Sequence, residues 1–348
     1  ARRRPIRTGV HQDDMPIFTA DTLTWLLFVA TAALYAFLNG FSDSANTVAT
    51  MISSRAMNPR QALGLSAIAH FVGPFLFGIA VAATIGEEFI VSEAATLPVI
   101  WAALLSAILW SLITAWSGIP SSASHALIGG MMGAAILGYG TDAIILGGLE
   151  KVLGALLLSP ILGLIGGYVL MKGVIFLARG ASPRINNFFK RSQVFTAVAL
   201  ALSHGANDAQ KAMGVIAMGL LATGRLSAFA VPQWAVILCA GAMSLGTLLG
   251  GWRIIKTLGG RFYKIRPVHS FNSQLASTLI ILGAALMGGP VSTSQVVSAT
   301  ILGAGAAERL NKVRWGVARN ILLTWLLTVP AAAAIAAVSY LLLRHLLP

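Results

Sequence analysis

Charged residues are scarce in this sequence. They make up only 10% of its 348 residues, whereas a water-soluble domain carries roughly 25%. Long stretches contain no Asp, Glu, Lys or Arg, and each can cross a hydrocarbon layer of roughly 30 Å as a helix of about 20 residues. These stretches are 61–85, 96–137, 231–251, 275–307 and 320–343. The deficit excludes a soluble globular protein and predicts an all-α integral membrane protein.

Cysteine and catalytic motifs are also missing. The single cysteine, Cys239, cannot build a disulfide framework or a cysteine metal site. The ATP-binding pattern G-x-x-x-x-G-K-S/T does not occur, so ATP hydrolysis by this chain alone is not expected. We find no clustered His–Asp–Ser set and no dense metal-ligand spacing. This argues against an enzyme, including one that acts on phosphorylated lipid, and we expect no cofactor.

The charge that is present is mostly positive. A net charge of +13 would suggest a nucleic-acid partner in a soluble chain, but no basic patch here is interleaved with aromatic residues. The cations lie mostly in the short loops 54–60, 179–192, 252–270 and 308–314. Such loops face the cytoplasm in membrane proteins. We therefore expect a multi-pass protein of the inner (plasma) membrane and no nucleic-acid partner.

The apolar segments form two sets of five. The first set is 21–53, 61–84, 96–117, 120–138 and 144–178. The second is 193–222, 231–251, 273–289, 290–307 and 315–345. The chain then divides into a polar tail at 1–20, a first repeat at 21–178, a cytoplasmic linker loop at 179–192 and a second repeat at 193–348. Because five is odd, the halves should run in opposite senses, as inverted-topology repeats with some broken or re-entrant helices.

Two polar motifs occur once in each half. Gly40–Asn46 (GFSDSAN) matches Gly205–Lys211 (GANDAQK), which lies 165 residues later. Gly118–His125 (GIPSSASH) matches Gly288–Gln295 (GGPVSTSQ), which lies 170 residues later. The same order and nearly the same offset indicate that the second half repeats the first.

The first motif predicts a cation site. Asp43 and Asp208 each follow about 20 largely apolar residues, and a carboxylate inside a membrane costs several kcal/mol unless it faces a cavity and has a partner. The simpler alternative is that the span ends there and water solvates the aspartates. Oxygen ligands beside a glycine break suit a hard cation. The candidate coupling-ion residues are Ser42, Asp43, Asn46, Asn207, Asp208, Gln210 and Lys211.

Lys211 is open to two interpretations. It stands three residues after Asp208, at a spacing that allows a simple ion pair on one helix face. It could also replace a bound cation in the second half, where the first half has Asn46. Both interpretations predict a conventional cation site at Asp43 and an altered one at Asp208.

The second motif predicts an anion site. Gly118 and Gly288 interrupt a helix, and Pro120 and Pro290 favour the first turn of a new one. Free backbone N–H groups and the positive dipole end of such a helix bind oxyanions. Serines that merely cap and pack helices are the alternative. The candidate anion-binding residues are Ser122, Ala123, Ser124, Ser292, Thr293 and Ser294.

Two histidines lie near these motifs. His125 could relay protons, although its counterpart Gln295 cannot titrate, so such a role would be asymmetric. A hydrogen-bonded packing role is equally compatible with His125 and is favoured for His70.

At these residues the sequence resembles the inorganic phosphate transporter (PiT) family. The family's Gly-Ala-Asn-Asp motif stands intact at Gly205–Asp208, while the first copy has Phe41 and Ser42 in place of Ala-Asn. A Pro-Val-Ser-Thr-Thr-type motif occurs at Pro290–Ser294 and more loosely at Pro120–Ser124. Gly251–Gly259 (GWRIIKTLG) is also typical of the family.

The resemblance implies symport of inorganic phosphate with H⁺ or Na⁺, in a homodimer. The Gln210–Lys211 variant is similar to the proton-coupled bacterial branch of low-affinity permeases, some of which carry a divalent metal together with phosphate. A sulfate permease of the same fold is the first alternative. An anion channel is a weaker one, because inverted broken helices favour alternating access.

Overall fold

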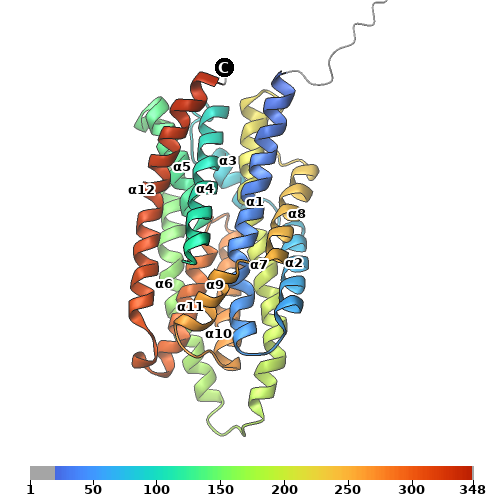
Figure 1. Ribbon diagram of the computed structural model, residues 1–348, viewed down its shortest axis with the longest axis vertical. Coiled ribbons are helices and arrows are strands. Elements are labelled where there is room, and N and C mark those ends of the chain that lie inside the picture. Colours follow the sequence, from blue (N-terminus) through green and yellow to red (C-terminus); the bar gives the residue numbers. More distant parts are fainter. Residues whose placement is uncertain (1–19, 347–348) are drawn as a thin grey trace, which may run out of the picture.

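A computed structural model describes residues 20–346, so the polar tail expected at 1–20 lies almost wholly outside the described residues. The first half contains α1 (Ala20–Ser53), α2 (Pro59–Leu76), α3 (Ala80–Glu87), α4 (Leu97–Ser117), α5 (Ala123–Tyr139) and α6 (Leu146–Leu177). The second contains α7 (Ile185–Ala222), α8 (Gln233–Leu249), α9 (Trp252–Lys256), α10 (Pro267–Leu286), α11 (Thr293–Glu308) and α12 (Trp315–Leu346). Figure 1 shows these helices as one elongated bundle. The expectation of an all-helical membrane protein is confirmed at this level.

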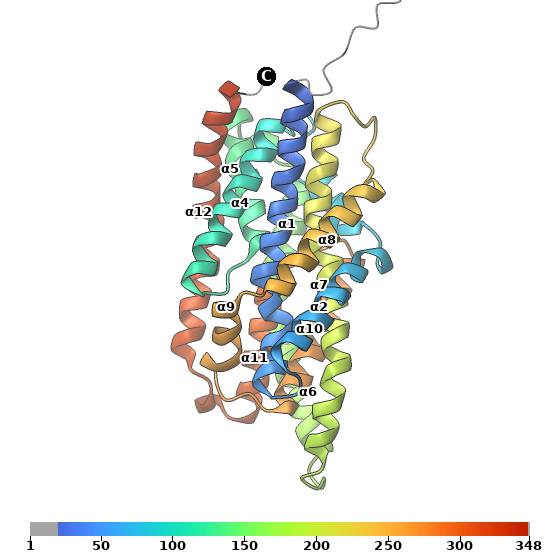
Figure 2. The same ribbon diagram turned by 45° about the vertical axis from the view of Figure 1, so that its right-hand side comes forward.

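The helices of the second half follow the same order as those of the first. α1 corresponds to α7, the pair α2–α3 to α8–α9, and α4, α5 and α6 to α10, α11 and α12. Lengths agree closely, with 32 residues in both α6 and α12, and 17 and 16 in α5 and α11. Corresponding helices point in opposite directions: α1 runs downward in Figures 1 and 2, whereas α7 runs upward.

The two halves are interlocked. α6 packs against α10 and α11 of the other half, and α12 packs in the same way against α4 and α5. Likewise α1 packs against α8, and α7 against α2. The halves are therefore not separate bodies, and the segment expected as a linker is short, since α7 begins at Ile185 inside it.

One segment expected as a single span is bent, and a second bend follows the end of another. Within the described residues, α1, α4, α6 and α12 are each long and apolar enough to cross a membrane. The expected span at 61–84 is instead α2 and α3, which meet at 72°, and α8 meets the α9 segment at 60°. The expected span at 231–251 is the single helix α8, and the bend lies between it and α9, which falls in the segment expected as a loop at 252–270. Left-handed glycines mark both breaks, Gly78 at φ 77° and Gly250 at φ 67°, a conformation that glycine adopts without steric cost.

The segments expected as neighbouring spans at 96–117 and 120–138 form a hairpin, as do those at 273–289 and 290–307. α4 ends at Gly118 (φ 67°), and Gly288 (φ 72°) follows the end of α10. Both turns lie inside the bundle, and α5 and α11 return toward the ends from which α4 and α10 entered (Figure 2). Thr257, in the π-helical turn after α9, donates a hydrogen bond to the Gly118 carbonyl (2.8 Å) and covers the α4 tip.

Glycine allows close helix contact next to both aspartates. A Cβ on Gly40 would lie 2.0 Å from the Met243 carbonyl oxygen, and one on Gly205 would lie 2.4 Å from that of His70. These contacts involve backbone atoms, which cannot rotate away as a side chain can. The glycine three residues before each aspartate therefore fixes the approach of α1 to α8 and of α7 to α2.

The first prediction concerns this contact. Gly205→Ala should force α7 away from α2 and lower the thermal midpoint of the purified protein, at a cost on the order of 1–3 kcal/mol, as for other overpacked cores. Gly241→Ala in α8 is the matched control, because a Cβ there meets nothing within 4 Å. The control should be neutral or stabilising. Equal midpoints for the two variants would contradict the close-contact role of Gly205.

Candidate functional site

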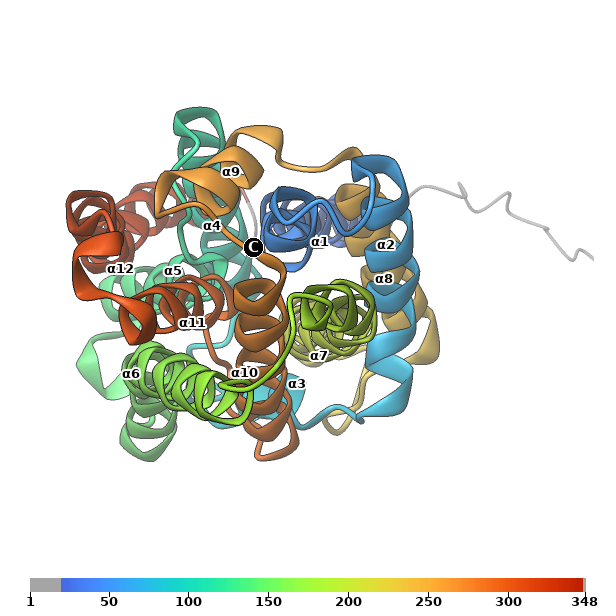
Figure 3. The ribbon, with the colours of Figure 1, turned by 90° about the horizontal axis from the view of Figure 1, so that it is seen from below.

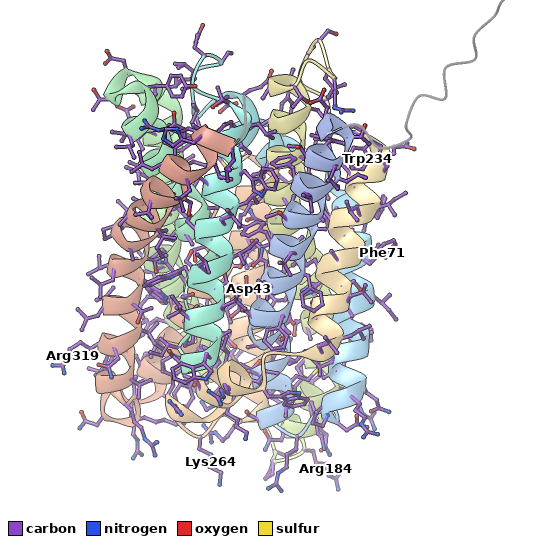
Figure 4. The ribbon with its side chains drawn as sticks, turned by 45° about the horizontal axis from the view of Figure 1, so that its top comes forward. Asp43, Phe71, Arg184, Trp234, Lys264 and Arg319 are labelled. Atoms are coloured by element: carbon purple, nitrogen blue, oxygen red, sulfur yellow. The ribbon has the colours of Figure 1, made fainter. Side chains whose placement is uncertain are left out.

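Asp43 and Asp208 lie in the middle of α1 and α7, buried inside the bundle. Their exposed fractions are 5% and 2%, and Figure 4 shows Asp43 midway between the two ends. Both helices continue well past the aspartates, to Ser53 and Ala222. The structure therefore does not support the alternative in which the spans end at solvated aspartates.

Asp43 is held by neutral donors. Its Oδ1 accepts hydrogen bonds from the Ser294 hydroxyl (2.6 Å) and the Asn46 amide (3.0 Å). Its Oδ2 accepts a longer one from the Thr293 hydroxyl (3.4 Å). The Asn46 amide also donates to Ser294 Oγ (3.0 Å). The first α11 residues therefore bind directly to the carboxylate of α1.

Asp208 has a different environment, because Lys211 neutralises it. The Lys211 ammonium donates to Asp208 Oδ1, as expected for an ion pair at this spacing. Asp208 Oδ2 accepts from the Thr293 hydroxyl (2.8 Å) and lies 2.9 Å from Nδ1 of His204. The single hydroxyl proton of Thr293 can be donated to either carboxylate, and the shorter distance favours Asp208, so Thr293 lies between the two aspartates.

His204 completes a cluster that sequence reasoning missed. One ligand atom each from Asp43, His204 and Asp208 lie within 4.8 Å of one another. His204 precedes Asp208 by four residues, so the i,i+4 spacing on one helix face could have revealed it. Two carboxylates, an imidazole nitrogen and nearby hydroxyls are a donor set that suits a small cation.

The Pro-Ser motifs form the N-termini of α5 and α11. Ser122 caps α5 by accepting from the His125 N–H (3.1 Å), and Ser292 caps α11 by accepting from the Gln295 N–H (3.4 Å). The first N–H groups of a helix have no partner within that helix. In α5 and α11 these groups belong to Ala123, Ser124, Thr293 and Ser294. The positive dipole ends of both helices thus point into the interior.

The two N-termini meet at Lys211. Its ammonium donates to the Ser124 hydroxyl (2.6 Å) and to the Val291 carbonyl (3.0 Å). Ser124 Oγ also donates to that carbonyl (3.2 Å). His125 Nε2 lies 3.4 Å from the Gln295 amide, so the corresponding positions of the two motifs are neighbours. The structure thus brings candidates from both motifs into one cluster, which contains Asp43, Asn46, Asp208, Lys211, Ser124, Thr293 and Ser294.

Some candidate residues lie apart from this cluster. Gln210 bridges the α2–α3 break, where its Nε2 donates to the Gly78 carbonyl (2.6 Å) and its Oε1 accepts from Val81 N–H (2.9 Å). Asn207 donates to the Gly289 carbonyl (3.1 Å), which leaves its buried Oδ1 without a hydrogen-bond partner among the described residues. Ser42 is only partly buried, and its Oγ has no such partner either.

Two further buried side chains extend the cluster. The ring of His70 stacks on that of His204 at 5.3 Å, and its Nδ1 lies 2.8 Å from Thr247 Oγ1. This is the packing role favoured for His70 from the sequence. The Tyr35 hydroxyl donates to the Ala123 carbonyl at the α5 N-terminus (3.4 Å), a contact that no sequence motif indicated.

Comparisons with known proteins agree with this architecture. The model of the "Phosphate transporter family" matches residues 39–179 and 177–336. A Bacillus subtilis protein described as "Probable low-affinity inorganic phosphate transporter" is 44% identical over 92% of this chain and 97% of its own length. A Rhizobium meliloti protein with the same description is 42% identical, over 90% of this chain and 94% of its own.

A solved structure has the same fold. It is titled "The sodium-dependent phosphate transporter" and superposes with a TM-score of 0.84 at 24% identity. The match covers 93% of this chain and all of the other. At this level of identity the likeness shows the fold alone.

The second prediction concerns the shared hydroxyl. Thr293→Val keeps the side-chain shape but removes the one hydroxyl that lies within hydrogen-bonding distance of both carboxylates, at a cost of about 1 kcal/mol for a lost hydrogen bond. We expect weaker stabilisation of the purified protein by inorganic phosphate and also by the cation, Na⁺ or H⁺, that stabilises the wild type, measured as smaller shifts of the thermal midpoint. Thr328→Val in α12 is the control. It removes a buried hydroxyl that accepts a hydrogen bond from Trp110 Nε1 (3.1 Å), on a helix that contributes no residue to the cluster. A change in only one of the two responses would contradict a shared site.

Proposed function

Because the chain belongs to the phosphate transporter family, we propose that it is a secondary symporter that moves inorganic phosphate with a cation across the plasma membrane. One observation carries the proposal. Two buried carboxylates and one buried ammonium meet the N-termini of two broken helices in a single cluster. Such a cluster offers adjacent places for a cation and an oxyanion.

The charge count supports a coupling cation. Asp43 and Asp208 carry two negative charges against the single positive charge of Lys211, while the three side chains that donate hydrogen bonds to Asp43 are neutral. An unpaired buried charge is strongly unfavourable. A cation or proton at Asp43 would balance it. In this proposal Lys211 permanently supplies the charge that a second cation would otherwise bring to Asp208.

The anion is held by the two helix N-termini. Free N–H groups and positive dipole ends bind a phosphate without a dedicated basic side chain. Lys211 lies between the two motifs and adds a positive charge there. The same cluster contains carboxylate and imidazole groups that suit a divalent metal, so transport of a metal–phosphate complex belongs to the proposal.

The architecture supports alternating access. We propose that the two halves are inverted repeats, with hairpins α4–α5 and α10–α11 reaching the central cluster from opposite ends (Figure 2). Transporters of this kind bind their substrate midway, where discontinuous helices meet. In this proposal the end with the basic loops faces the cytoplasm, and Figure 4 shows Arg184, Lys264 and Arg319 toward that end. A homodimer, implied by the family resemblance, is part of the same proposal.

Uptake of labelled phosphate into proteoliposomes tests the function directly. Sodium and pH gradients are imposed separately, with sulfate as competitor. Uptake should rise with at least one of the two gradients, and the active gradient identifies the coupling ion. Uptake that ignores both gradients would overturn symport, and stronger competition by sulfate than by unlabelled phosphate would change the assigned substrate.

The third prediction concerns Asp43. Asp43→Asn removes the charge that the coupling cation balances, so gradient-driven uptake should be lost while the protein remains folded. Asp142→Asn, at an exposed position after α5, is the matched control and should transport normally. Wild-type uptake by the Asp43 variant would show that the cation binds elsewhere.

A further inference from the structure

A column of neutral polar side chains leads from the central cluster toward the basic end of the bundle. We define the polar column as Thr50, Ser54, Gln193, Thr196 and Gln274. Thr50 lies near the end of α1 and Ser54 directly after it, Gln193 and Thr196 lie in the first half of α7, and Gln274 lies in α10. In Figure 3, viewed from the basic end, α1, α7 and α10 lie next to one another near the centre. The column contains no charged side chain.

Hydrogen bonds connect these side chains across the three helices. The Gln274 amide donates to Thr50 Oγ1 (3.2 Å), and Thr196 Oγ1 donates to Gln274 Oε1 (2.7 Å). Nearer the basic end, Ser54 Oγ donates to Gln193 Oε1 (2.7 Å). Thr50, Gln193 and Gln274 are at most 2% exposed, whereas Ser54 and Thr196 are partly exposed. The column therefore runs from the buried interior to the edge of the bundle.

The column is continuous with the site. Thr50 lies one helical turn after Asn46, which binds Asp43. On α11, Ser298 lies one turn after Ser294, which binds the same carboxylate. Ser298 is fully buried, and its hydroxyl has no hydrogen-bond partner among the described residues. An unpaired buried hydroxyl is costly in a purely structural role.

The corresponding positions of the other half are apolar. The repeat offsets of 165 and 170 match Thr50 with Val215, Gln193 with Phe28, Gln274 with Leu104, Ser54 with Gly219 and Ser298 with Ile128. Residues that touch in one half also touch in the other. Ser54 is hydrogen-bonded to Gln193, and their counterparts Gly219 and Phe28 are in close contact, since a Cβ on Gly219 would lie 2.3 Å from the Phe28 ring. Only Thr196 matches a polar residue, Thr31. Phe28, Leu104, Ile128 and Val215 all belong to one hydrophobic core cluster.

This difference argues that the column has a function of its own. The same helix packing is achieved with hydrocarbon side chains in the opposite half, so the fold does not require polar groups here. When helices part, water can replace hydrogen bonds between hydroxyl and amide groups at a small net cost. When helices separate at the apolar counterpart positions of the other half, hydrophobic surface becomes exposed to water instead. The polar side is therefore the side that can admit water and ions more readily.

We propose that the polar column, together with Ser298, lines the cytoplasmic half of the transport route, along which the carried ions leave the central cluster between α1, α7, α10 and α11. The proposal rests on the proposed function and on the basic end being cytoplasmic. The apolar counterpart positions form the seal toward the outside in this conformation. Water and carried ions then reach the cluster from the cytoplasm through the column.

Cysteine accessibility tests the route. The only native thiol is the buried Cys239, so Cys239→Ser gives a thiol-free background. In that background Ser298→Cys is nearly isosteric, and Ile128→Cys is its matched control at the corresponding position of the other half. Both are treated with a charged, membrane-impermeant methanethiosulfonate reagent in inside-out and in right-side-out membrane vesicles. Thr50→Cys with Val215→Cys is a second pair, in case the first does not fold.

We expect the column cysteine to be modified in inside-out vesicles, with loss of phosphate uptake, and its counterpart to stay unmodified from that face. An unreactive column cysteine in folded protein, or equal modification of both positions from the cytoplasmic face, would overturn the proposal. Either result would mean that the column only ties helices together. Uptake by the Cys239→Ser background is measured first. Absence of uptake by the folded wild type, measured beside it, would refute the proposed function, while labelling would still report whether the route exists.

Discussion

Two carboxylates buried side by side in the middle of a membrane bundle are the constraint on which the rest of this structure depends. Leaving one such charge unpaired costs about 3–5 kcal/mol, so the surrounding residues have to compensate for Asp43 and Asp208. Lys211 pairs with Asp208 and His204 lies beside it on α7, while Thr293 and Ser294 donate hydrogen bonds from the start of α11; the remaining negative charge is the one that the proposed cation balances. The cation position and the anion position are consequently parts of one hydrogen-bonded cluster.

Corresponding glycines in the two halves place these groups. Gly40 and Gly205 let α1 and α7 approach the neighbouring backbone closely just before each aspartate. Gly118 and Gly288 turn the two hairpins inside the bundle, so that α5 and α11 begin there. The two halves share the order of their helices, but the chemistry of their motifs differs. Lys211 in place of Asn46 makes the aspartates unequal, and the polar column makes the two ends of the bundle unequal.

Much of the architecture could be predicted from the sequence, because charge-free segments and loop cations follow directly from the properties of a bilayer. The paired motifs also indicated which residues would meet. Their contacts could not be predicted in detail. The motif assigns Thr293 and Ser294 to the anion alone. In the structure Ser294 donates to Asp43, and Thr293 lies between the two aspartates, since the α11 N-terminus lies against α1 and α7. Gln210 was grouped with the cation residues by its place in a motif, but its amide bridges the break between α2 and α3, a bend invisible in composition. His204 lacked a role because its significance depends on Asp43 from another helix.

The central claim is that cation and phosphate bind in one cluster and affect each other there. Titration calorimetry on the purified protein tests it most directly, by measuring the Kd of phosphate over a range of Na⁺ concentrations and pH values, and the Kd of the active cation with and without phosphate. We expect the cation to tighten phosphate binding, and phosphate to tighten cation binding by the same factor, as linkage requires. A phosphate Kd that is independent of both Na⁺ and pH would contradict the shared cluster.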